Sequence, residues 1–258
     1  MVIGKYRDDL ENHCIGIMTS KSYLRSSLRK CVPLGLTAAV QRCARFLVPD
    51  SFISYAQEGE DLVLCRFLEV RKGGFYVDVG AHHPRRFSNT NSFYERGWHG
   101  INIEPSPAAI QLFERFCPKD INVMVGVAET PGELAYYIFN DPALNTFDQV
   151  LMQDRVAQTP YRVIGTTTVA VDRLEKILGG KLPEGQVIDF MSIDVEGFDL
   201  QVLRSNDWSR YRPEFVLVEA LDFKLKRASQ HPVHIFMNGI GYELVAKTLN
   251  TLFYRDIK

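Results

Sequence analysis

Several carboxylates in this chain stand where short apolar runs end. They are Asp78, Glu104, Glu129, Asp194, Glu196, Glu219 and Asp222. Such runs are typical of buried parallel strands, and in an open parallel sheet ligands bind outside the carboxyl ends of the strands. We therefore expect these carboxylates to meet at one edge of a sheet and to line a ligand site there.

The stretch YVDVGAHHPRRFSNT, residues 76–90, indicates the kind of ligand. Asp78 and Gly80 after an apolar run predict a tight turn, and Glu104 is placed to accept hydrogen bonds from a ribose diol. This pairing predicts a nucleoside ligand. The glycine-rich run that grips a pyrophosphate is missing, so S-adenosylmethionine fits better than NAD. The simpler alternatives are a strand-end cap for Asp78 and a solvated carboxylate for Glu104.

The elements that must position these groups alternate in the βαβ manner, which predicts an α/β fold: a doubly wound, mostly parallel sheet with an antiparallel edge hairpin. We expect a long loop with a short helix over 140–160, where acceptor choice could lie. Strands are expected at 75–79, 101–104, 123–127, 133–139, 166–171, 187–194 and 215–219, and the hairpin at 242–247 and 251–255. Helices are expected at 56–70, 108–116 and 172–178, the last with Asp172 as its N-cap.

Six segments of the chain resemble the FkbM-type S-adenosylmethionine-dependent methyltransferases. They are SYAQEGEDLVL (54–64), GFYVDVGAHHPRRFSNT (74–90), YERGWHGINIEPSP (94–107), TTTVAVDRL (166–174), IDFMSIDVEGFDLQVL (188–203) and RPEFVLVE (212–219). Together they cover most of residues 54–220 in the family's order. The resemblance implies a class I methyltransferase fold, with a Rossmann-like sheet, and O-methylation of a sugar hydroxyl or a natural-product alcohol.

The resemblance also implies residues that hold the cofactor. The turn at Asp78 would lie against its methionine side, Glu104 would hold the ribose, and Ala128 would lie at the edge of the adenine. The full set expected to contact S-adenosylmethionine is Gln57, Glu60, Asp78, Gly80, Ala81, Glu104, Pro105, Ala128, Glu129 and Asp194. Many relatives have a second glycine where this chain has Pro84, so the path of that loop is expected to differ.

Methyl transfer to a hydroxyl needs in-line geometry and usually a base. Asp194 and Glu196 are two residues apart, so their side chains share one face if the backbone stays extended. Such a pair could serve as a general base or bind Mg²⁺, with Asp194, Glu219 and Asp222 as the candidate metal ligands. The alternative is a structural role, in which one of the pair accepts hydrogen bonds from backbone amides.

The loop after Gly80 holds further candidates. They are His82, His83, Arg85, Arg86 and Asn89. Either histidine could act as a base near neutral pH, and the arginines could recognise a carboxylate or phosphate on the acceptor, with the asparagine lining the site. Ordinary hydrogen bonding, capping or solvent exposure is the competing explanation for each.

The composition narrows the class of protein. Of 258 residues, 46% are hydrophobic, and 30 basic residues nearly balance 31 acidic ones, which predicts a folded protein without a general attraction to nucleic acid. Five cysteines without a C-x-x-C pair favour a reducing cytoplasm. No run approaches the length needed to span a bilayer, and the first ten residues lack a signal-peptide core.

The first 50 residues fall outside the resemblance and are expected to form an extension to a domain over 51–258. The segment 21–49 contains no acidic residue and interleaves basic residues with leucines. It could be a basic amphipathic helical pair on a membrane surface or a partner, or a helical appendage packed on the domain with solvated arginines.

Three hypotheses for function follow. The first is an O-methyltransferase acting on a glycan, a glycolipid or a secondary metabolite. The second is an NAD(P)-dependent oxidoreductase or epimerase, which the missing glycine-rich run disfavours. The third is a non-catalytic nucleoside-binding scaffold of the same fold. A nucleic-acid methyltransferase is disfavoured by the absence of an Asn-Pro-Pro-Tyr-type motif.

Overall fold

The computed structural model describes residues 52–68 and 71–258 of the chain. The chain divides into two units at Ile53, and the account below concerns the second, Ser54–Lys258. The extension expected over 1–50, with its basic segment 21–49, lies outside the described residues. No helix in the described part is long and apolar enough to cross a membrane.

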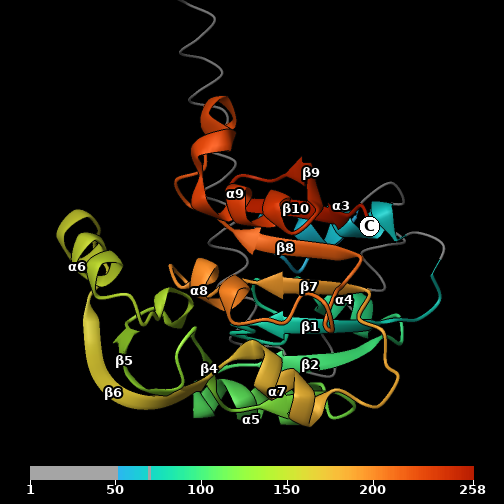
Figure 1. Ribbon diagram of the computed structural model, residues 1–258. Coiled ribbons are helices and arrows are strands. Elements are labelled where there is room, and N and C mark those ends of the chain that lie inside the picture. Colours follow the sequence, from blue (N-terminus) through green and yellow to red (C-terminus); the bar gives the residue numbers. More distant parts are fainter. Residues whose placement is uncertain (1–51, 69–70) are drawn as a thin grey trace, which may run out of the picture. The chain divides into compact units, whose positions relative to one another are not determined.

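A seven-stranded sheet organises this unit (Figure 1). Its strands lie in the order β3 (Ile121–Val123), β2 (His99–Ile103), β1 (Phe75–Val79), β7 (Phe190–Ile193), β8 (Phe215–Glu219), β10 (Thr251–Asp256) and β9 (Tyr242–Lys247). The first five are parallel, and β10 runs antiparallel to both of its neighbours. The predicted α/β fold is therefore confirmed, including the antiparallel edge. The strand order reverses between β1 and β7, which makes this pair the switch point where ligands bind.

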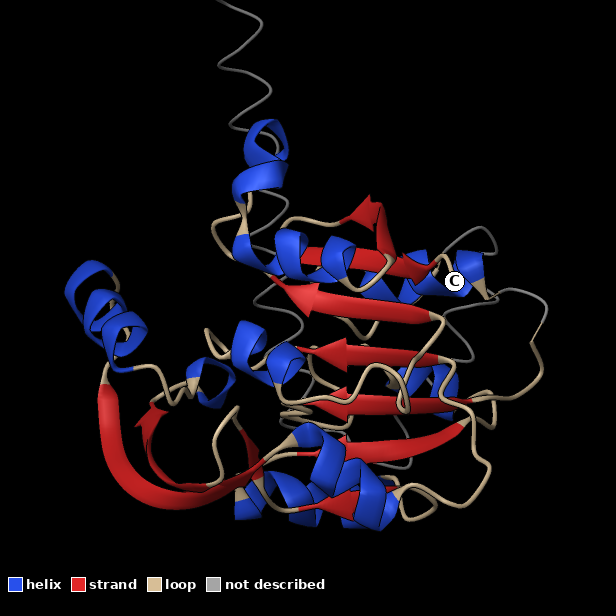
Figure 2. Ribbon diagram, viewed as in Figure 1, coloured by secondary structure: helices blue, strands red, loops and turns tan. Residues whose placement is uncertain are grey.

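Helices cover both faces of the sheet (Figure 2). Successive side chains of β1 point to opposite faces of the sheet, as in any β-strand. Val77 belongs to the core beneath α7 (Leu174–Lys181), α8 (Asp199–Arg204) and α9 (Pro232–Gly239). Tyr76 belongs to the core beneath α3 (Glu60–Phe67) and α4 (Asn91–Tyr94). Burying each large apolar side chain stabilises the fold by about 1.5–3 kcal/mol, so these two cores hold the strand ends in place.

A smaller sheet lies beside the carboxyl edge of the large one (Figure 1). Its strands follow the order β4 (Gly126–Val127), β6 (Val163–Asp172) and β5 (Gly132–Phe139). Between β5 and β6 the chain forms a 3₁₀ turn, η1 (Pro142–Leu144), and helix α6 (Gln149–Gln158). The stretch 140–160 is thus a loop with a helix, as predicted, and it projects beside the expected ligand site.

Several element boundaries differ from the sequence-based expectation. The helix expected over 56–70 begins only at Glu60, because Gly59 takes a left-handed φ of 88° immediately before it. The strand expected over 123–127 is two strands, since the chain leaves the large sheet after Val123 and enters the small one at Gly126. The strand expected from 187 begins at Phe190, and the Val187 side chain before it is exposed.

Asp172 is not the N-cap of α7, contrary to expectation. It ends β6 and forms an ion pair with Lys176 at 2.9 Å, while Arg173 occupies the N-cap position. Three helices were not predicted, namely α4, α8 and α9. They have 4, 6 and 8 residues, so they present too few turns for a clear helical period in the sequence.

Candidate active site

A cleft at the carboxyl edge of the large sheet brings most of the predicted site residues together. It contains about 800 Å³ of space free of protein atoms, part of it open to solvent. The predicted residues that line it are Gln57, Asp78, Gly80, Ala81, His82, Asn89, Glu104, Pro105, Asp194 and Glu196. Of the seven carboxylates expected to meet, the four at the ends of β1, β2 and β7 line this cleft, namely Asp78, Glu104, Asp194 and Glu196.

The turn after β1 is pressed against two neighbouring strands. Gly80 has a left-handed φ of 78°, and a Cβ at this position would lie 1.9 Å from the carbonyl oxygen of Asp194. The amides of Gly80 and Ala81 donate to the carbonyl oxygen of Ile103 at 2.9 and 3.2 Å. Only glycine fits here, because both the conformation and the contact exclude a side chain.

Asp78 is buried at the floor of the cleft. Burial raises the pKa of its carboxyl to about 7, against the opposing effect of Thr90 Oγ1, which donates to Asp78 Oδ2 at 2.9 Å. Next to it, Asn89 Nδ2 donates to Ser192 Oγ on β7 at 3.0 Å. The segment 88–90 therefore supports both strands from within the cleft.

Glu104 fixes the backbone on either side of it. Its two carboxylate oxygens accept hydrogen bonds from the amides of His82 and Ser106, each at 2.9 Å. Burial raises its pKa to about 7. Each oxygen retains a lone pair, so Glu104 can still accept hydrogen bonds from a diol.

His82 faces the cleft in a strained conformation. Its φ is 52°, which is uncommon for a residue with a side chain. Burial lowers the pKa of the imidazole to about 4, and Nε2 is buried without a hydrogen-bond partner among the described residues. The ring is therefore neutral at pH 7, with one nitrogen available to a ligand.

Three carboxylates form a cluster at the ends of β7 and β8. Asp194, Glu196 and Glu219 each offer an oxygen, and these oxygens lie within 4.8 Å of one another. Burial and the neighbouring Asp194 raise the pKa of Glu219 to about 12, and burial with the charge of Glu196 raises that of Asp194. Like charges this close cannot all ionise, so the cluster retains at least one proton at neutral pH.

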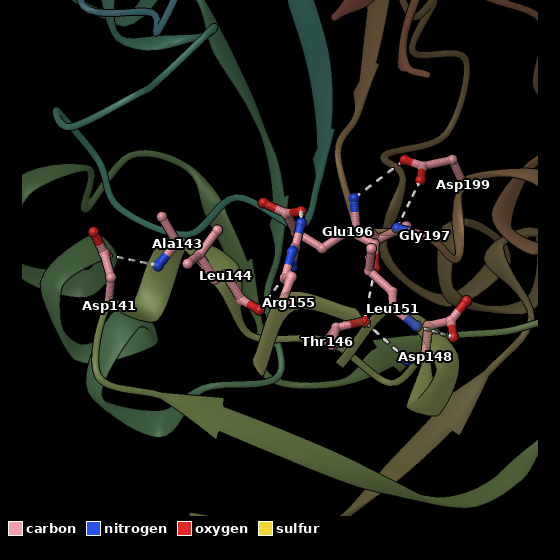
Figure 3. Close-up of polar contacts among 11 residues, drawn as sticks. Asp141, Ala143, Leu144, Thr146, Asp148, Leu151, Arg155, Glu196, Gly197 and Asp199 are labelled. Atoms are coloured by element: carbon pink, nitrogen blue, oxygen red, sulfur yellow. Dashed lines mark hydrogen bonds and ion pairs between the residues drawn. The ribbon is translucent and has the colours of Figure 1, made fainter. Parts of the chain in front are cut away.

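Arg155 on α6 contacts this cluster and was missed by the sequence analysis (Figure 3). Its Nη2 forms an ion pair with Glu196 Oε2, and its Nη1 donates to the carbonyl oxygen of Leu144 at 3.0 Å. Glu196 has a left-handed φ of 54°, and its own carbonyl accepts from Thr146 Oγ1 at 2.7 Å. The insertion between β5 and β6 thus determines the position of Glu196. The sequence of α6 does not distinguish Arg155 from its other polar residues, because the helix buries no residue and so shows no buried face.

Asp199 holds the other side of the same turn. Its carboxylate accepts from the amides of Val195 and Gly197 at 3.2 and 3.1 Å (Figure 3). Burial raises its pKa to about 7. These contacts match the structural alternative considered for the Asp194 and Glu196 pair, but a different carboxylate makes them.

The remaining residues of the His82–Asn89 loop have structural partners. His83 Nδ1 accepts from the amides of Arg85 and Arg86, each at 3.0 Å. The Arg85 guanidinium lies 5.1 Å from the ring centre of Phe116. Arg86 forms a bidentate pair with Asp141 at 2.9 and 2.7 Å, which ties this loop to the insertion. None of His83, Arg85 and Arg86 is among the cleft-lining residues.

Five other predicted residues also lie outside the cleft lining, and one of them is Glu219 of the carboxylate cluster. Glu60 is buried and accepts from Thr248 Oγ1 at 2.6 Å. Ala128 and Glu129 follow β4, whereas Val125, Gly126 and Val127 line the cleft in their place. Asp222 does not join the carboxylate cluster: its side chain is 87% exposed and pairs with His231 at 2.8 Å. Of the oxygen ligands considered from the sequence, Asp194, Glu196 and Glu219 therefore come together, and Asp222 does not.

The charge of the cleft is one-sided. Its lining contains four carboxylates, Asp78, Glu104, Asp194 and Glu196, and no lysine or arginine among the described residues. With Gly80 admitting close backbone approach and Glu104 open to a diol, the residues present suit a nucleoside that carries positive charge. A ligand with phosphates would meet repulsion from the carboxylates.

A family model, the methyltransferase FkbM domain, matches residues 78–244 of this chain. A comparison with curated proteins found no match.

Solved structures with a similar arrangement are methyltransferases of low sequence identity. A TehB-like S-adenosylmethionine-dependent methyltransferase from Corynebacterium glutamicum has 11% identity and a TM-score of 0.37, over 87% of this chain and 100% of that one. A putative caffeoyl-CoA O-methyltransferase from Staphylococcus aureus has 10% identity and a TM-score of 0.41, over 92% and 99%. A Burkholderia thailandensis 1,6-didemethyltoxoflavin-N1-methyltransferase, solved with S-adenosylhomocysteine, has 13% identity and a TM-score of 0.40, over 88% and 92%. TM-scores this low support no conclusion about activity.

Proposed function

The chain belongs to the FkbM methyltransferase family, and from this premise we propose that it is an S-adenosylmethionine-dependent O-methyltransferase. Its acceptor would be a hydroxyl of a glycan, a glycolipid or a secondary metabolite. The observation that carries the proposal is the lining of the cleft, which has four carboxylates and no lysine or arginine among the described residues.

This charge distribution favours a sulfonium nucleoside over a dinucleotide. Opposite unit charges 4 Å apart attract by about 4 kcal/mol at an effective dielectric constant near 20, and like charges repel by the same amount. A cofactor with a positive sulfur favours the ionised form of these carboxyl groups, whose pKa burial raises in the ligand-free cleft, whereas the pyrophosphate of NAD(P) finds no cation among the described lining residues. The oxidoreductase alternative is disfavoured for that reason as well as for the missing glycine-rich run.

Particular residues would hold the cofactor. Asp78 and the Gly80 turn would receive its methionine part, and Glu104 would accept hydrogen bonds from the ribose hydroxyls. Val125, Gly126 and Val127 line the cleft beyond Glu104 and would border the adenine, in place of the expected Ala128 and Glu129. When bound, S-adenosylmethionine would supply an electrophilic methyl group on its sulfonium.

Asp194 is our candidate for the base that removes the hydroxyl proton. It lines the cleft, and burial and the charge of Glu196 raise its pKa, which makes it a better proton acceptor than an ordinary aspartate. Glu196 also lines the cleft, but its carboxylate is engaged by Arg155. An acceptor that loses a proton on methylation, such as a hydroxyl, makes use of such a base.

A divalent metal ion is a second candidate partner of the same cluster. Asp194, Glu196 and Glu219 present oxygen ligands of the kind that Mg²⁺ prefers. Arg155 already places a positive charge against Glu196, so we favour transfer without a metal. Methyl transfer that survives exhaustive chelation would support this choice, and transfer restored only by added Mg²⁺ would contradict it.

Calorimetric titration tests the proposal. The full chain should bind S-adenosylhomocysteine and should not bind NAD. Absence of S-adenosylhomocysteine binding would falsify the methyltransferase proposal, and tight NAD binding would favour the oxidoreductase. Incubation with methyl-labelled S-adenosylmethionine and an extract of the source cells then separates an enzyme from a scaffold, because a scaffold binds the cofactor without incorporating label. Cytoplasmic location and the exclusion of nucleic-acid acceptors stay predictions.

A further inference from the structure

A surface patch of basic residues and leucines lies at the C-terminal side of the sheet. We name it the basic–leucine patch and define it as Lys224, Leu225, Lys226, Arg227, Lys247 and Leu249, all of which surround one shallow surface hollow. It combines the 3₁₀ segment η2 (Leu225–Gln230), which follows β8, with the turn that joins β9 to β10. Two segments that are separate in the sequence thus form one surface.

The two leucines of the patch are unusually exposed. Leu225 is 70% exposed and Leu249 is 76% exposed, each at the surface of a short connecting segment. Neither belongs to a hydrophobic core of the described residues. Exposure of single leucines is common, but here both border one hollow and are surrounded by cations. Two exposed leucines surrounded by basic residues at one hollow indicate a binding surface.

The charge of the patch is uniformly positive. Four of its six residues are lysine or arginine, and no carboxylate of the described part of the chain lines the hollow. Asp222, which precedes the patch in the sequence, is paired with His231 at 2.8 Å. The Nζ of Lys247 lies 6.0 Å from the ring centre of Phe223 and donates to the carbonyl oxygen of Thr248 at 2.7 Å, so its ammonium group is held in the patch.

Hydrogen bonds fix the patch to the edge of the cleft. The carbonyl oxygen of Asn250, beside Leu249, accepts from the amide of Ala220 at 2.8 Å, directly after Glu219. The Asn250 amide and side chain donate to the Glu58 carboxylate at 2.8 and 3.0 Å. Glu58 adjoins Gln57, which lines the cleft. A ligand bound to the patch would therefore lie beside the cleft at the carboxyl edge of the large sheet.

We infer that the basic–leucine patch docks on an anionic membrane surface. Lysine and arginine beside the membrane are attracted to anionic headgroups, and leucines that project between them can enter the boundary with the acyl chains. A protein partner fits less well, because protein interfaces are depleted in lysine and centre on contiguous apolar or aromatic residues. Docking here would place the cleft beside the lipid surface.

Vesicle flotation of the full chain tests this inference. We expect binding to vesicles of phosphatidylcholine with phosphatidylglycerol, weaker binding to phosphatidylcholine alone, and loss of binding at high salt. The double variant Leu225→Ser with Leu249→Ser, and separately Lys224→Glu with Lys226→Glu, should each lower the partition onto anionic vesicles at least about tenfold. Matched controls are Val187→Ser, at a residue 71% exposed elsewhere, and Lys119→Glu with Lys181→Glu at other exposed positions.

The outcomes separate the possible occupants. Loss in both patch variants with binding retained in the controls supports the inference. Equal binding of all variants overturns it and assigns any membrane contact to another part of the chain. A patch that instead joins copies of this chain would show as a concentration-dependent oligomer, lost in the patch variants while vesicle binding is unchanged, and this result would also overturn it. Circular dichroism of each variant confirms that the fold is intact.

Discussion

Arg155 on α6 and Glu196 in the turn after β7 form an ion pair across 41 positions of sequence (Figure 3). The pair joins the insertion of the small sheet to the carboxylate cluster of the large one. Both side chains are mostly buried, at 12% and 15% exposure, so their attraction is screened little by solvent. We regard Arg155 as a positioning residue, because it acts through Glu196.

Replacing Arg155 should impair turnover more than cofactor binding. In Arg155→Met, Glu196 loses its partner and the turn loses its support, so we expect methyl incorporation to fall by up to about 10²-fold while the affinity for S-adenosylhomocysteine is little changed. Arg155→Lys should recover part of the loss, because it restores the charge. The control is Arg162→Met, at an exposed residue after α6. An equal loss in the control, or no loss in Arg155→Met, would refute the positioning role.

Variants of Asp194 and Glu196 should distinguish effects on methyl transfer from effects on cofactor binding. We expect Asp194→Asn to lower methyl incorporation by about 10²- to 10⁴-fold, because it removes the proposed base. Glu196→Gln should have a smaller effect, comparable with that of Arg155→Met. Titration with S-adenosylhomocysteine checks that both variants still bind cofactor. If Asp194→Asn retains full turnover, another group removes the proton, and His82, with its unpartnered Nε2 among the described residues, becomes the first candidate.

Two buried carboxylates should determine cofactor affinity. Asp78→Asn and Glu104→Gln keep the shape of each side chain but remove its charge. We expect S-adenosylhomocysteine to bind about 10- to 100-fold more weakly in each, as for the loss of a charged hydrogen bond. Glu129→Gln is the matched control, since Glu129 lies outside the cleft lining. Affinities that fall equally in all three variants would indicate a non-specific effect of charge.

Glycine 80 offers a test of the close approach between β1 and β7. Gly80→Ala would place a Cβ 1.9 Å from the backbone of Asp194, in addition to the strain of a φ of 78°. Gly59→Ala is its control, because Gly59 has a φ of 88° and no atom of the described residues lies within 4 Å of the added atom. We expect Gly59→Ala to cost about 1 kcal/mol of unfolding free energy and Gly80→Ala at least about 2 kcal/mol more. Urea denaturation measures both, and equal costs would rule out the clash.

The raised pKa of Asp78 should make the unfolding free energy of the ligand-free protein depend on pH. Burial raises its pKa from 3.8 to about 7, so between these values the folded state binds a proton that the unfolded state releases. Its contribution to stability is therefore complete below pH 3.8 and is lost as the pH rises through 7, by up to about 1.4 kcal/mol per pH unit.

Asp78→Asn removes this titration, so its unfolding free energy should fall less steeply than that of the parent protein between pH 4 and pH 7. Denaturation curves at several pH values measure the difference. Asp154→Asn, at an exposed carboxylate on α6, should leave the slope unchanged. Parallel pH profiles for Asp78→Asn and the parent protein would contradict the raised pKa.

Local patterns allowed much of the fold to be predicted. The run 75–79 is a strand with the bounds expected, and so is 215–219, because mostly apolar runs this short between turn formers favour a buried strand over a helix. The edge hairpin was also predicted correctly, because polar and apolar residues are mixed in its two strands, whereas the inner strands are mostly apolar. Short helices such as α4 were not predicted, because they contain too few residues to show a helical pattern. The division of 123–127 into two strands was not predicted either, because the passage of the chain from one sheet to the other does not change the hydrophobic pattern.

The sequence by itself determined which polar groups stand at the strand ends: the turn at Gly80, the carboxylates at the ends of β1, β2 and β7, and the absence of a phosphate-binding glycine run all follow from residue type and short spacing. Only the tertiary structure decided which polar groups face each other. Arg86 binds Asp141 rather than facing the cleft, Asp222 pairs with His231 rather than with Glu219, and Arg155 reaches Glu196. For Arg86 and Arg155 the physical reason is that the route of the chain from β5 to β6 brings distant side chains together, and for Asp222 it is the fold of the segment after β8; hydrophobic periodicity records neither.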